Sequence, residues 1–168
     1  MRPMDEDFAA YVRSRQHRLL RAAYLVCGDR QTAEDLLQQA FVKLALRWET
    51  IRDEHPDAYV RRILYRDAIS AWRSRRRETL THVPEHPRAG EETRVEDKID
   101  LQRALRLLAP RQRAVLVLRY YEDRSERETA AILGISVGTV KSQAHDGLIR
   151  IRTLVPELSP TPTGGEPS

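Results

Sequence analysis

A stripe of arginines is the densest concentration of charge in the sequence. Arg62, Arg66, Arg73 and Arg77 follow one another at steps of four, seven and four residues, which places them on one face of a helix. Over residues 59–77 there are seven arginines and one acid, Asp67, so Arg61, Arg75 and Arg76 widen the stripe. Such a basic track binds the phosphates of nucleic acid, while nearby aromatic rings can stack on unpaired bases. The alternative is a solvated charged face above a core that contains Trp48 and Trp72. The binding candidates are Arg62, Arg66, Ser70, Arg73, Arg76 and Arg77.

A second candidate site lies between Ser125 and Arg152. Ser125 and Glu128 form the S-x-x-E pattern of a capping box, and Ala130, Gly134 and Val140 follow at steps of four and six. These are the small residue, the turn glycine and the packing residue of a helix-turn-helix, whose second helix lies in the major groove of DNA. A plain helical hairpin is the alternative. The predicted inward face of the second helix holds Val140, Ala144, Leu148 and Ile151. The candidates for DNA contact, including the helix cap, are Ser136, Gly138, Thr139, Lys141, Ser142, His145 and Asp146.

No arrangement of residues indicates catalysis, a cofactor or a metal. There is no glycine-rich phosphate loop, and the single cysteine, Cys27, has no evident base and is predicted to be a core residue. His82 and His86 are four residues apart, but prolines interrupt the helix that would bring them to one face. We therefore expect a binding protein rather than an enzyme.

Helical periodicity dominates the elements that must position these residues. The spacing predicts helices over about 5–26, from a cap at Thr32 through Trp48, and over about 56–77. Helices resume at about Ile99, with Pro110 opening a further one and two short helices starting from Ser125 and Ser136. The predicted fold class is all-α.

A change of composition divides the chain. Residues 78–98 hold six acids, three bases and two prolines with few apolar residues, which is typical of a mobile linker. The sequence therefore predicts two small helical domains, residues 1–77 and 99–155, that move independently around an acidic linker, residues 78–98. A low-complexity tail, residues 156–168, is expected to be disordered.

Length and composition exclude several classes of protein. The chain of 168 residues has no apolar run long enough for a membrane span, and its first residues lack the apolar stretch of a signal peptide. We therefore expect a soluble, cytoplasmic protein. Of its 29 basic residues only three are lysines, and the planar guanidinium of arginine suits phosphates and base edges.

Taken together, the two halves resemble a sigma factor of the extracytoplasmic-function (ECF) group of the sigma-70 family, with a pattern most similar to an actinobacterial subfamily. The resemblance covers about Phe8 to Leu154. Region 2 is similar in AEDLLQQAFVKL (33–44) and AYVRRILYRDAISAWRSRRR (58–77), and region 4 in PRQRAVLVLRYYEDRSERETAAILGISVGTVKS (110–142).

The resemblance implies a role for each half. Asp35, Gln38 and Gln39 would bind the clamp helices of the β′ subunit of core RNA polymerase, and the arginine helix would open and capture the −10 promoter element. The helix-turn-helix would read the −35 element, next to the β flap of the polymerase. An anti-sigma factor is the further expected partner, and no cofactor is implied.

The sequence departs from the family pattern at four positions. An acid is frequent where Gln39 stands, asparagine where Arg66 stands, and arginine where Gln143 and Asp146 stand. These departures leave open a degenerate paralogue that binds polymerase without initiating. A second alternative is a helix-turn-helix regulator of the response-regulator output type, although residues 1–98 lack the alternating strands of a receiver domain.

Overall fold

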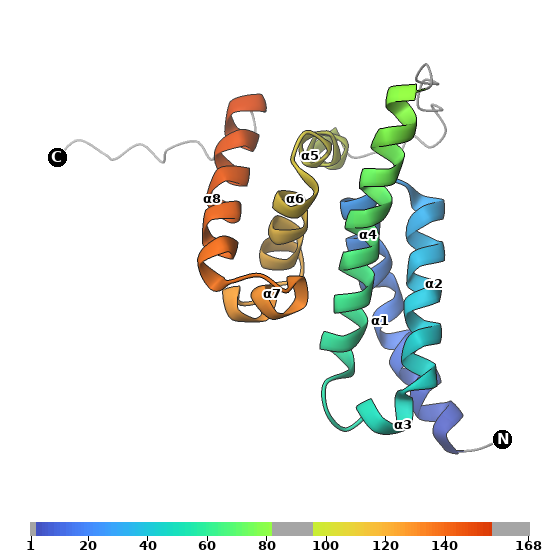
Figure 1. Cartoon of the computed structure of the whole chain (residues 1–168). Coiled ribbons are helices and arrows are strands. Elements are labelled where there is room, and N and C mark those ends of the chain that lie inside the picture. Colours follow the sequence, from blue (N-terminus) through green and yellow to red (C-terminus); the bar gives the residue numbers. More distant parts are fainter. Residues whose placement is uncertain (1–2, 82–95, 156–168) are drawn as a thin grey trace.

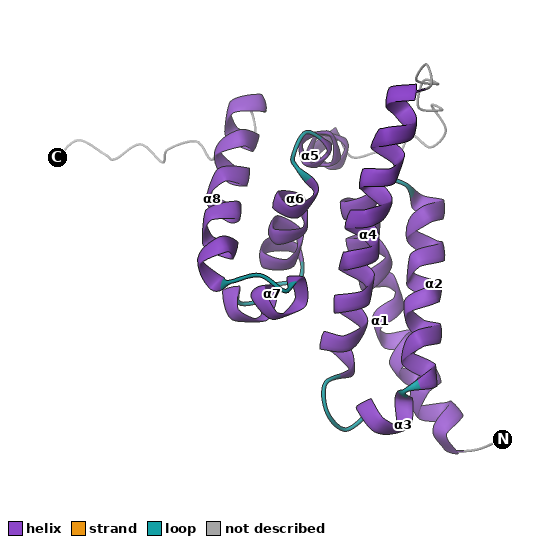
Figure 2. Cartoon of the chain, viewed as in Figure 1, coloured by secondary structure: helices purple, strands orange, loops and turns teal. Residues whose placement is uncertain are grey.

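The computed structural model describes residues 3–81 and 96–155, and every regular element in those two ranges is helical (Figures 1 and 2). The elements in chain order are α1 (Pro3–Cys27), α2 (Arg30–Leu46), α3 (Trp48–Ile51), α4 (Pro56–Thr81), α5 (Glu96–Arg106), α6 (Pro110–Leu116), the π-helical turn η1 (Val117–Tyr121), α7 (Glu126–Leu133) and α8 (Val137–Leu154). The expected all-α fold class is confirmed. No helix in the described part of the chain is long and apolar enough to cross a membrane.

The N-terminal half is a bundle of α1, α2 and α4, with the short α3 closing one end (Figure 1). Each long helix buries a stripe spaced at three or four residues, because only one face of each can reach the shared core. At the α3 end, Trp48 is 6% exposed and packs edge-on against Phe8 and tilted against Tyr11, with ring centroids 5.3 Å apart in both pairs. Cys27 is fully buried, as predicted.

The start of α2 differs from the prediction. Thr32 is not the cap: Asp29 takes that place, and its carboxylate accepts hydrogen bonds from Thr32 N at 2.9 Å and Thr32 Oγ1 at 2.6 Å. The helix therefore begins at Arg30, and Glu34 and Asp35 lie beyond its first turn. It also ends at Leu46, so that Trp48 belongs to α3 rather than to the same helix.

The C-terminal half consists of α5 to α8 and η1. The helix opened by Pro110 ends at Leu116, and the chain then widens into the π-helical η1, where Glu122 N donates to Val117 O at 3.0 Å. This wider turn rotates the residues that follow it, and Glu122 becomes fully buried.

The boundary between the halves also differs from the expected linker. Helix α4 continues to Thr81 and α5 starts at Glu96, so both helices extend into the range 78–98. Residues 82–95 and the predicted tail, 156–168, lie outside the described residues.

The two halves are packed against one another in the structure. One hydrophobic cluster joins Leu19, Val60 and Leu64 of the bundle with Leu108 and Leu118 of the C-terminal half. Helix α4 lies beside α6 and α7 (Figure 1). Helix α1 contacts α6 and η1. The sequence predicted two bodies that move independently; in this structure they share a core. Their independent motion stays a prediction.

Candidate nucleic-acid interfaces

The helix-turn-helix is built by the local signals that predicted it. Ser125 Oγ accepts from Glu128 N at 3.0 Å while the Glu128 carboxylate accepts from Ser125 N at 2.8 Å, so the capping box is complete. Gly134 ends α7 in the left-handed region at φ 66°, where glycine is favoured because it has no Cβ. Ser136 caps α8 by accepting from Thr139 N at 3.1 Å. The turn between α7 and α8 is therefore fixed at both ends.

The packing side of α8 agrees with the predicted inward face and adds one residue. Val140 is fully buried in a small cluster with Val115 and Ala130, while Ala144, Leu148 and Ile151 are half-buried. Gly147 was not predicted: it is buried, and a Cβ there would lie only 3.2 Å from Leu116 Cδ1. The absent side chain lets α8 approach α6 closely.

The predicted DNA-contact residues all lie on the outer side of the α7–α8 turn, half-buried only at Thr139 and exposed elsewhere. Several have partners within the protein. Ser136 and Thr139 share a hydrogen bond at 2.8 Å between their hydroxyls, Ser142 Oγ donates to Thr139 O at 3.1 Å, and Lys141 Nζ lies 3.8 Å from Glu126. No hydrogen bond or ion pair within residues 3–81 and 96–155 engages the side chains of His145 or Asp146, which point to solvent.

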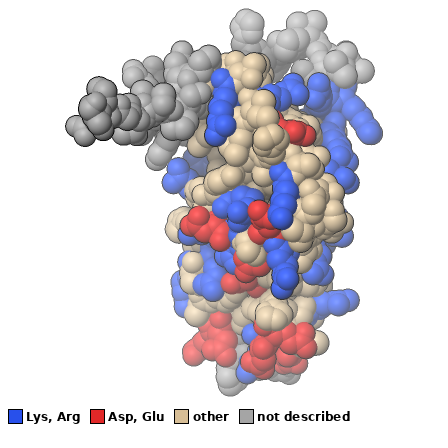
Figure 3. Space-filling model, turned by 90° about the vertical axis from the view of Figure 1, so that its left-hand side faces the viewer, with Lys and Arg blue, Asp and Glu red and all other residues tan. Residues whose placement is uncertain are grey.

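The face of the molecule that α8 presents carries both signs of charge. In Figure 3, blue and red side chains are intermingled on this side, without one continuous basic field. Asp146 adds a negative charge to this face and Gln143 adds no charge, so neither residue makes the face more positive. A mixed face binds duplex phosphates less strongly than a basic one.

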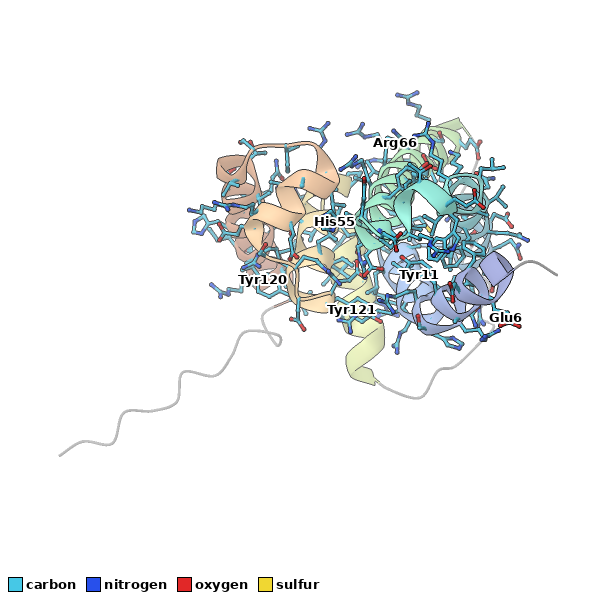
Figure 4. The ribbon with its side chains drawn as sticks, turned by 90° about the horizontal axis from the view of Figure 1, so that it is seen from below. Glu6, Tyr11, His55, Arg66, Tyr120 and Tyr121 are labelled. Carbon is cyan, nitrogen blue, oxygen red and sulfur yellow. The ribbon has the colours of Figure 1, made fainter. Side chains whose placement is uncertain are left out.

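The arginine stripe of α4 is exposed over its whole length. Arg62, Arg66, Ser70, Arg73, Arg76 and Arg77 are all exposed. Arg66 Nε lies 3.8 Å from the Asp67 carboxylate, and Figure 4 shows its side chain at the outer edge of the N-terminal half. Within the described part of the chain no ion pair engages Arg62, Arg73, Arg76 or Arg77. These guanidinium groups are therefore free to meet an anion.

Arg61 does not widen the stripe, contrary to the prediction. Its side chain is 2% exposed and turns to the opposite side of α4, where it pairs with Glu122. Trp72 is half-buried on that inner side as well, against Arg113 of α6. The helix thus has two faces: one exposed and basic, the other packed against the C-terminal half.

The third predicted surface is the outer side of α2. Asp35, Gln38 and Gln39 are exposed, and the same helix also exposes Val42 (57%) and Leu46 (82%). A groove between α1 and α2, lined by Leu20, Leu37, Gln38 and Phe41 among others, lies beside these residues. Apolar side chains left exposed next to amides are typical of a protein-binding surface.

The structure holds functional candidates that sequence reasoning missed: Glu122 and Arg113, both fully buried and charged, together with Tyr65. No local signal could identify them, because their partners lie up to 87 residues away in the sequence. The described residues contain no group of three or more His, Cys, Asp or Glu side chains placed to hold a metal ion; His82 and His86 lie outside those residues.

Comparison with protein families finds two matches. The model described as Sigma-70 region 2 matches residues 11–78, and the one described as Sigma-70, region 4 matches residues 98–160. The first match contains α2 and the arginine stripe, and the second contains the helix-turn-helix.

Curated relatives match most of the chain. It is 44% identical over 149 residues to the RNA polymerase sigma-E factor of Streptomyces coelicolor, covering 87% of this chain and 84% of that protein. It is also 32% identical over 151 residues to the ECF RNA polymerase sigma factor SigM of Mycobacterium tuberculosis, covering 86% of this chain and 76% of that protein.

Two solved structures share the fold. The sigma factor RpoE in complex with the anti-sigma factor NepR from Bartonella quintana superimposes with a TM-score of 0.72 at 24% identity, covering 92% of this chain and 99% of that one. CnrH in complex with the cytosolic domain of CnrY gives 0.68 at 23% identity, covering 92% of this chain and 91% of that one.

Proposed function

The chain belongs to the sigma-70 family of RNA polymerase sigma factors, within its ECF group, and from that membership we propose how its surfaces divide the work of promoter recognition. It is a sigma factor that binds core RNA polymerase and directs transcription to promoters with −10 and −35 elements. The observation that carries this function is the presence of both regions in one chain, each with its binding surface exposed. Sigma factors act by binding, and we assign this chain no catalytic step of its own.

The outer side of α2 is assigned to the β′ clamp helices of the polymerase. Asp35, Gln38 and Gln39 supply polar contacts there, and the exposed Val42 and Leu46 supply apolar area that becomes buried on docking. Gln39 can donate a hydrogen bond where the family frequently has an acid, so the contact at that position is amide-mediated rather than ionic.

The exposed face of α4 is assigned to the −10 element. Its guanidinium groups hold the backbone of the separated strands, which carries no sequence information by itself. Arg66 stands where the family commonly has asparagine. A guanidinium can form two hydrogen bonds to guanine, whereas an amide suits adenine, so we expect Arg66 to alter the preferred −10 base.

The outer side of α8 is assigned to the −35 element. The N-terminal half of α8 brings Gly138, Lys141, Ser142, His145 and Asp146 toward the major groove. Since this face has mixed charge, duplex binding there is weak, and more of the promoter affinity rests on α4 and on the polymerase.

An anti-sigma factor is the proposed regulatory partner, since the structurally similar sigma factor RpoE was solved with the anti-sigma factor NepR bound. The β flap of the polymerase is the proposed partner of the C-terminal half. We place the protein in the cytoplasm, where the polymerase acts.

The alternative function, a response-regulator output domain, would require a preceding receiver domain. Residues 3–81 instead form a helical bundle, and residues 11–78 of it match region 2, so this alternative does not fit the chain.

Run-off transcription tests the function directly. Purified core polymerase and the full chain are incubated with fragmented genomic DNA, and the transcript start sites are mapped. We expect start sites that share −10 and −35 sequences and vanish without the chain. Polymerase binding in a pull-down without any such transcripts would instead identify a degenerate paralogue that occupies polymerase without initiating.

A further inference from the structure

Asp67 is the one acid among the seven arginines of residues 59–77, and its carboxylate lies between two cations. Asp67 Oδ1 is 3.8 Å from Nε of Arg66, its neighbour on α4, and Asp67 Oδ2 is 3.8 Å from Nζ of Lys43 on α2. The side chain of Asp67 is 24% exposed, against 67% for Arg66 and 49% for Lys43. The carboxylate is therefore recessed between the two helices and paired with a cation from each.

The two contacts of Asp67 hold it in place better than a single exposed ion pair would. An isolated pair on a protein surface adds little, because both side chains stay mobile and water screens their charges. Asp67 has a short, partly buried side chain with a cation near each oxygen, so its carboxylate has few other orientations. Helices α2 and α4 pack against one another, which keeps Lys43 beside it. Asp67 thus gives Arg66 an anchor of defined position.

The anchor acts on the inner edge of the Arg66 guanidinium. The contact joins the carboxylate to Nε, the nitrogen nearest the aliphatic stem, and Arg66 donates no hydrogen bond within residues 3–81 and 96–155. Figure 4 shows the side chain at the outer edge of the N-terminal half. The two terminal nitrogens, Nη1 and Nη2, are left to bind a ligand side by side. This paired arrangement of donors matches the O6 and N7 acceptors of guanine.

Arg66 differs in this respect from the other arginines assigned to the −10 element. A guanidinium without an anchor can turn toward any nearby phosphate, and such a contact carries no sequence information. The carboxylate of Asp67 restricts the directions open to Arg66 and repels phosphates from the same place. Ion pairs are absent, in the part of the chain that the structure describes, from Arg62, Arg73, Arg76 and Arg77.

We propose that Asp67 is a positioning residue that holds Arg66 toward guanine at one position of the single-stranded −10 element. The proposal rests on the function assigned to α4 above and adds to it the source of base specificity. Arg66 contacts the base, while Asp67, held in turn by Lys43, sets the direction of its guanidinium. The remaining arginines of the stripe bind the backbone of the strand.

The test uses holoenzyme, assembled from core polymerase and the full chain, and promoter probes whose −10 region is single-stranded. Each −10 position carries each of the four bases in turn, and dissociation constants are measured at one salt concentration. With the wild type, we expect a probe with guanine at one position to bind about tenfold more tightly than the probe with adenine there. Arg66→Asn should shift the preference at that position to adenine, which identifies the base that Arg66 contacts.

Asp67→Asn keeps the shape of the side chain and removes its charge. We expect the preference for guanine at that position to fall by about threefold to tenfold, because Arg66 then also turns to phosphates. Asp123→Asn makes the same change at an exposed carboxylate of the C-terminal half and should leave the preference as in the wild type. In an Arg66→Asn background, Asp67→Asn should alter no base preference, since Asp67 acts only through Arg66.

Three results would overturn the proposal. An equal gain of affinity for all four bases in Asp67→Asn would mean that Asp67 acts only as a nearby negative charge. A change of base preference of the same size in the Arg66→Asn background would mean that Asp67 does not act through Arg66. Loss of helical circular dichroism in Asp67→Asn would mean that Asp67 is needed for folding.

The same measurements keep this proposal apart from the proposed function. If wild-type holoenzyme binds −10 probes no better than scrambled probes, the proposed function fails and the positioning role fails with it. If wild-type holoenzyme prefers the promoter probes while Asp67→Asn keeps the wild-type ratios between bases, the function stands and the positioning role alone fails.

Discussion

The guanidinium carbon of Arg113 lies 3.8 Å from the centre of the Trp72 ring, although the two residues belong to different halves of the protein. The same guanidinium donates to Leu105 O at 2.5 Å, Leu108 O at 3.1 Å and Val26 O at 2.7 Å. Burial lowers the pKa of Arg113 to about 10, so the group is still charged at neutral pH. One side chain thus satisfies carbonyls near the ends of α1 and α5 and joins both to α4.

Replacing Arg113 should destabilise the whole protein. Arg113→Met removes the guanidinium donor from three carbonyls, of which Leu105 O keeps a hydrogen bond from Leu108 N at 3.2 Å. We expect a loss of roughly 2–4 kcal/mol in the free energy of unfolding. Arg113→Lys should recover only part of it, because a single ammonium cannot match the planar fork or stack on the ring. Urea unfolding measures the effect, with the exposed neighbour Arg111→Met as control. If Arg113→Met and Arg111→Met unfold at the same urea concentration, Arg113 does not stabilise the fold as proposed.

Polymerase binding should depend on the outer side of α2. The double change Asp35→Arg with Gln38→Ala removes polar contacts and reverses a charge, without altering the core, because both side chains are exposed. We expect a tenfold or greater loss of affinity for core polymerase, about 1.4 kcal/mol or more, with an unchanged melting temperature. Glu54→Arg, an exposed charge reversal away from this face, is the control. Wild-type affinity of the double variant in a titration with purified polymerase would remove α2 from the interface.

Asp146 is predicted to weaken −35 binding by repelling phosphates. Asp146→Ala should then tighten binding to matched and scrambled duplexes about equally, and Asp146→Arg should do so more while steepening the dependence on salt. If Asp146 instead accepts a hydrogen bond from a cytosine amino group, Asp146→Ala should relax preference at one position, by roughly 1–3 kcal/mol. Duplex affinities at two salt concentrations separate the two mechanisms. Identical affinities for all three proteins would place Asp146 outside the interface.

Gly134 should tolerate asparagine better than alanine. A Cβ at this position meets no atom within 4 Å, so any cost comes from the backbone at φ 66° rather than from a clash. We expect Gly134→Ala to cost about 1 kcal/mol of stability and Gly134→Asn less, because asparagine adopts left-handed backbone more readily. Melting temperatures from thermal unfolding should therefore be lower for Gly134→Ala than for Gly134→Asn. The reverse order would show that the turn is not held in this conformation in solution.

Acid should remove a stabilising contact at Asp57. Partial burial by itself would raise the pKa of Asp57, but hydrogen bonds from Tyr11 Oη at 2.6 Å and Arg15 Nε at 3.1 Å outweigh it and lower the pKa. The ionised group therefore stabilises the fold above the ordinary aspartate pKa of about 3.9, and this contribution is lost as pH falls through the lower folded value.

The matching experiment compares melting temperatures of the wild type and Asp57→Asn between pH 6 and pH 3. The wild type should be more stable at pH 6, and the difference should shrink toward pH 3. Asp53→Asn, at a side chain that is 86% exposed, should show little difference at either pH. A gap for Asp57→Asn that stays constant with pH would mean that its carboxylate is not preferentially ionised in the fold.

The sequence by itself determined the parts of this protein whose causes are local. The Ser125–Glu128 capping box, the turn at Gly134 and the cap at Ser136 each depend on residues within a few positions, so composition and spacing identify them. Helical periodicity likewise placed Arg62, Arg66, Arg73 and Arg77 on one exposed face. At the start of α2 both Asp29 and Thr32 are suitable N-cap residues, and the sequence pattern predicted the wrong one, because the N-cap is Asp29.

Only the tertiary structure decided which charged residues are buried. Arg61 and Arg62 are neighbours of the same type, yet one is 2% exposed and the other faces solvent, because α4 meets the C-terminal half on one side only. The partner of Arg61 lies 61 residues away, and Glu122 reaches it through a π-helical turn that no helical period predicts. A buried charge is stable only where a distant element supplies its counterpart. The contact between the two halves therefore could not be predicted from the sequence, and only the folded structure shows it.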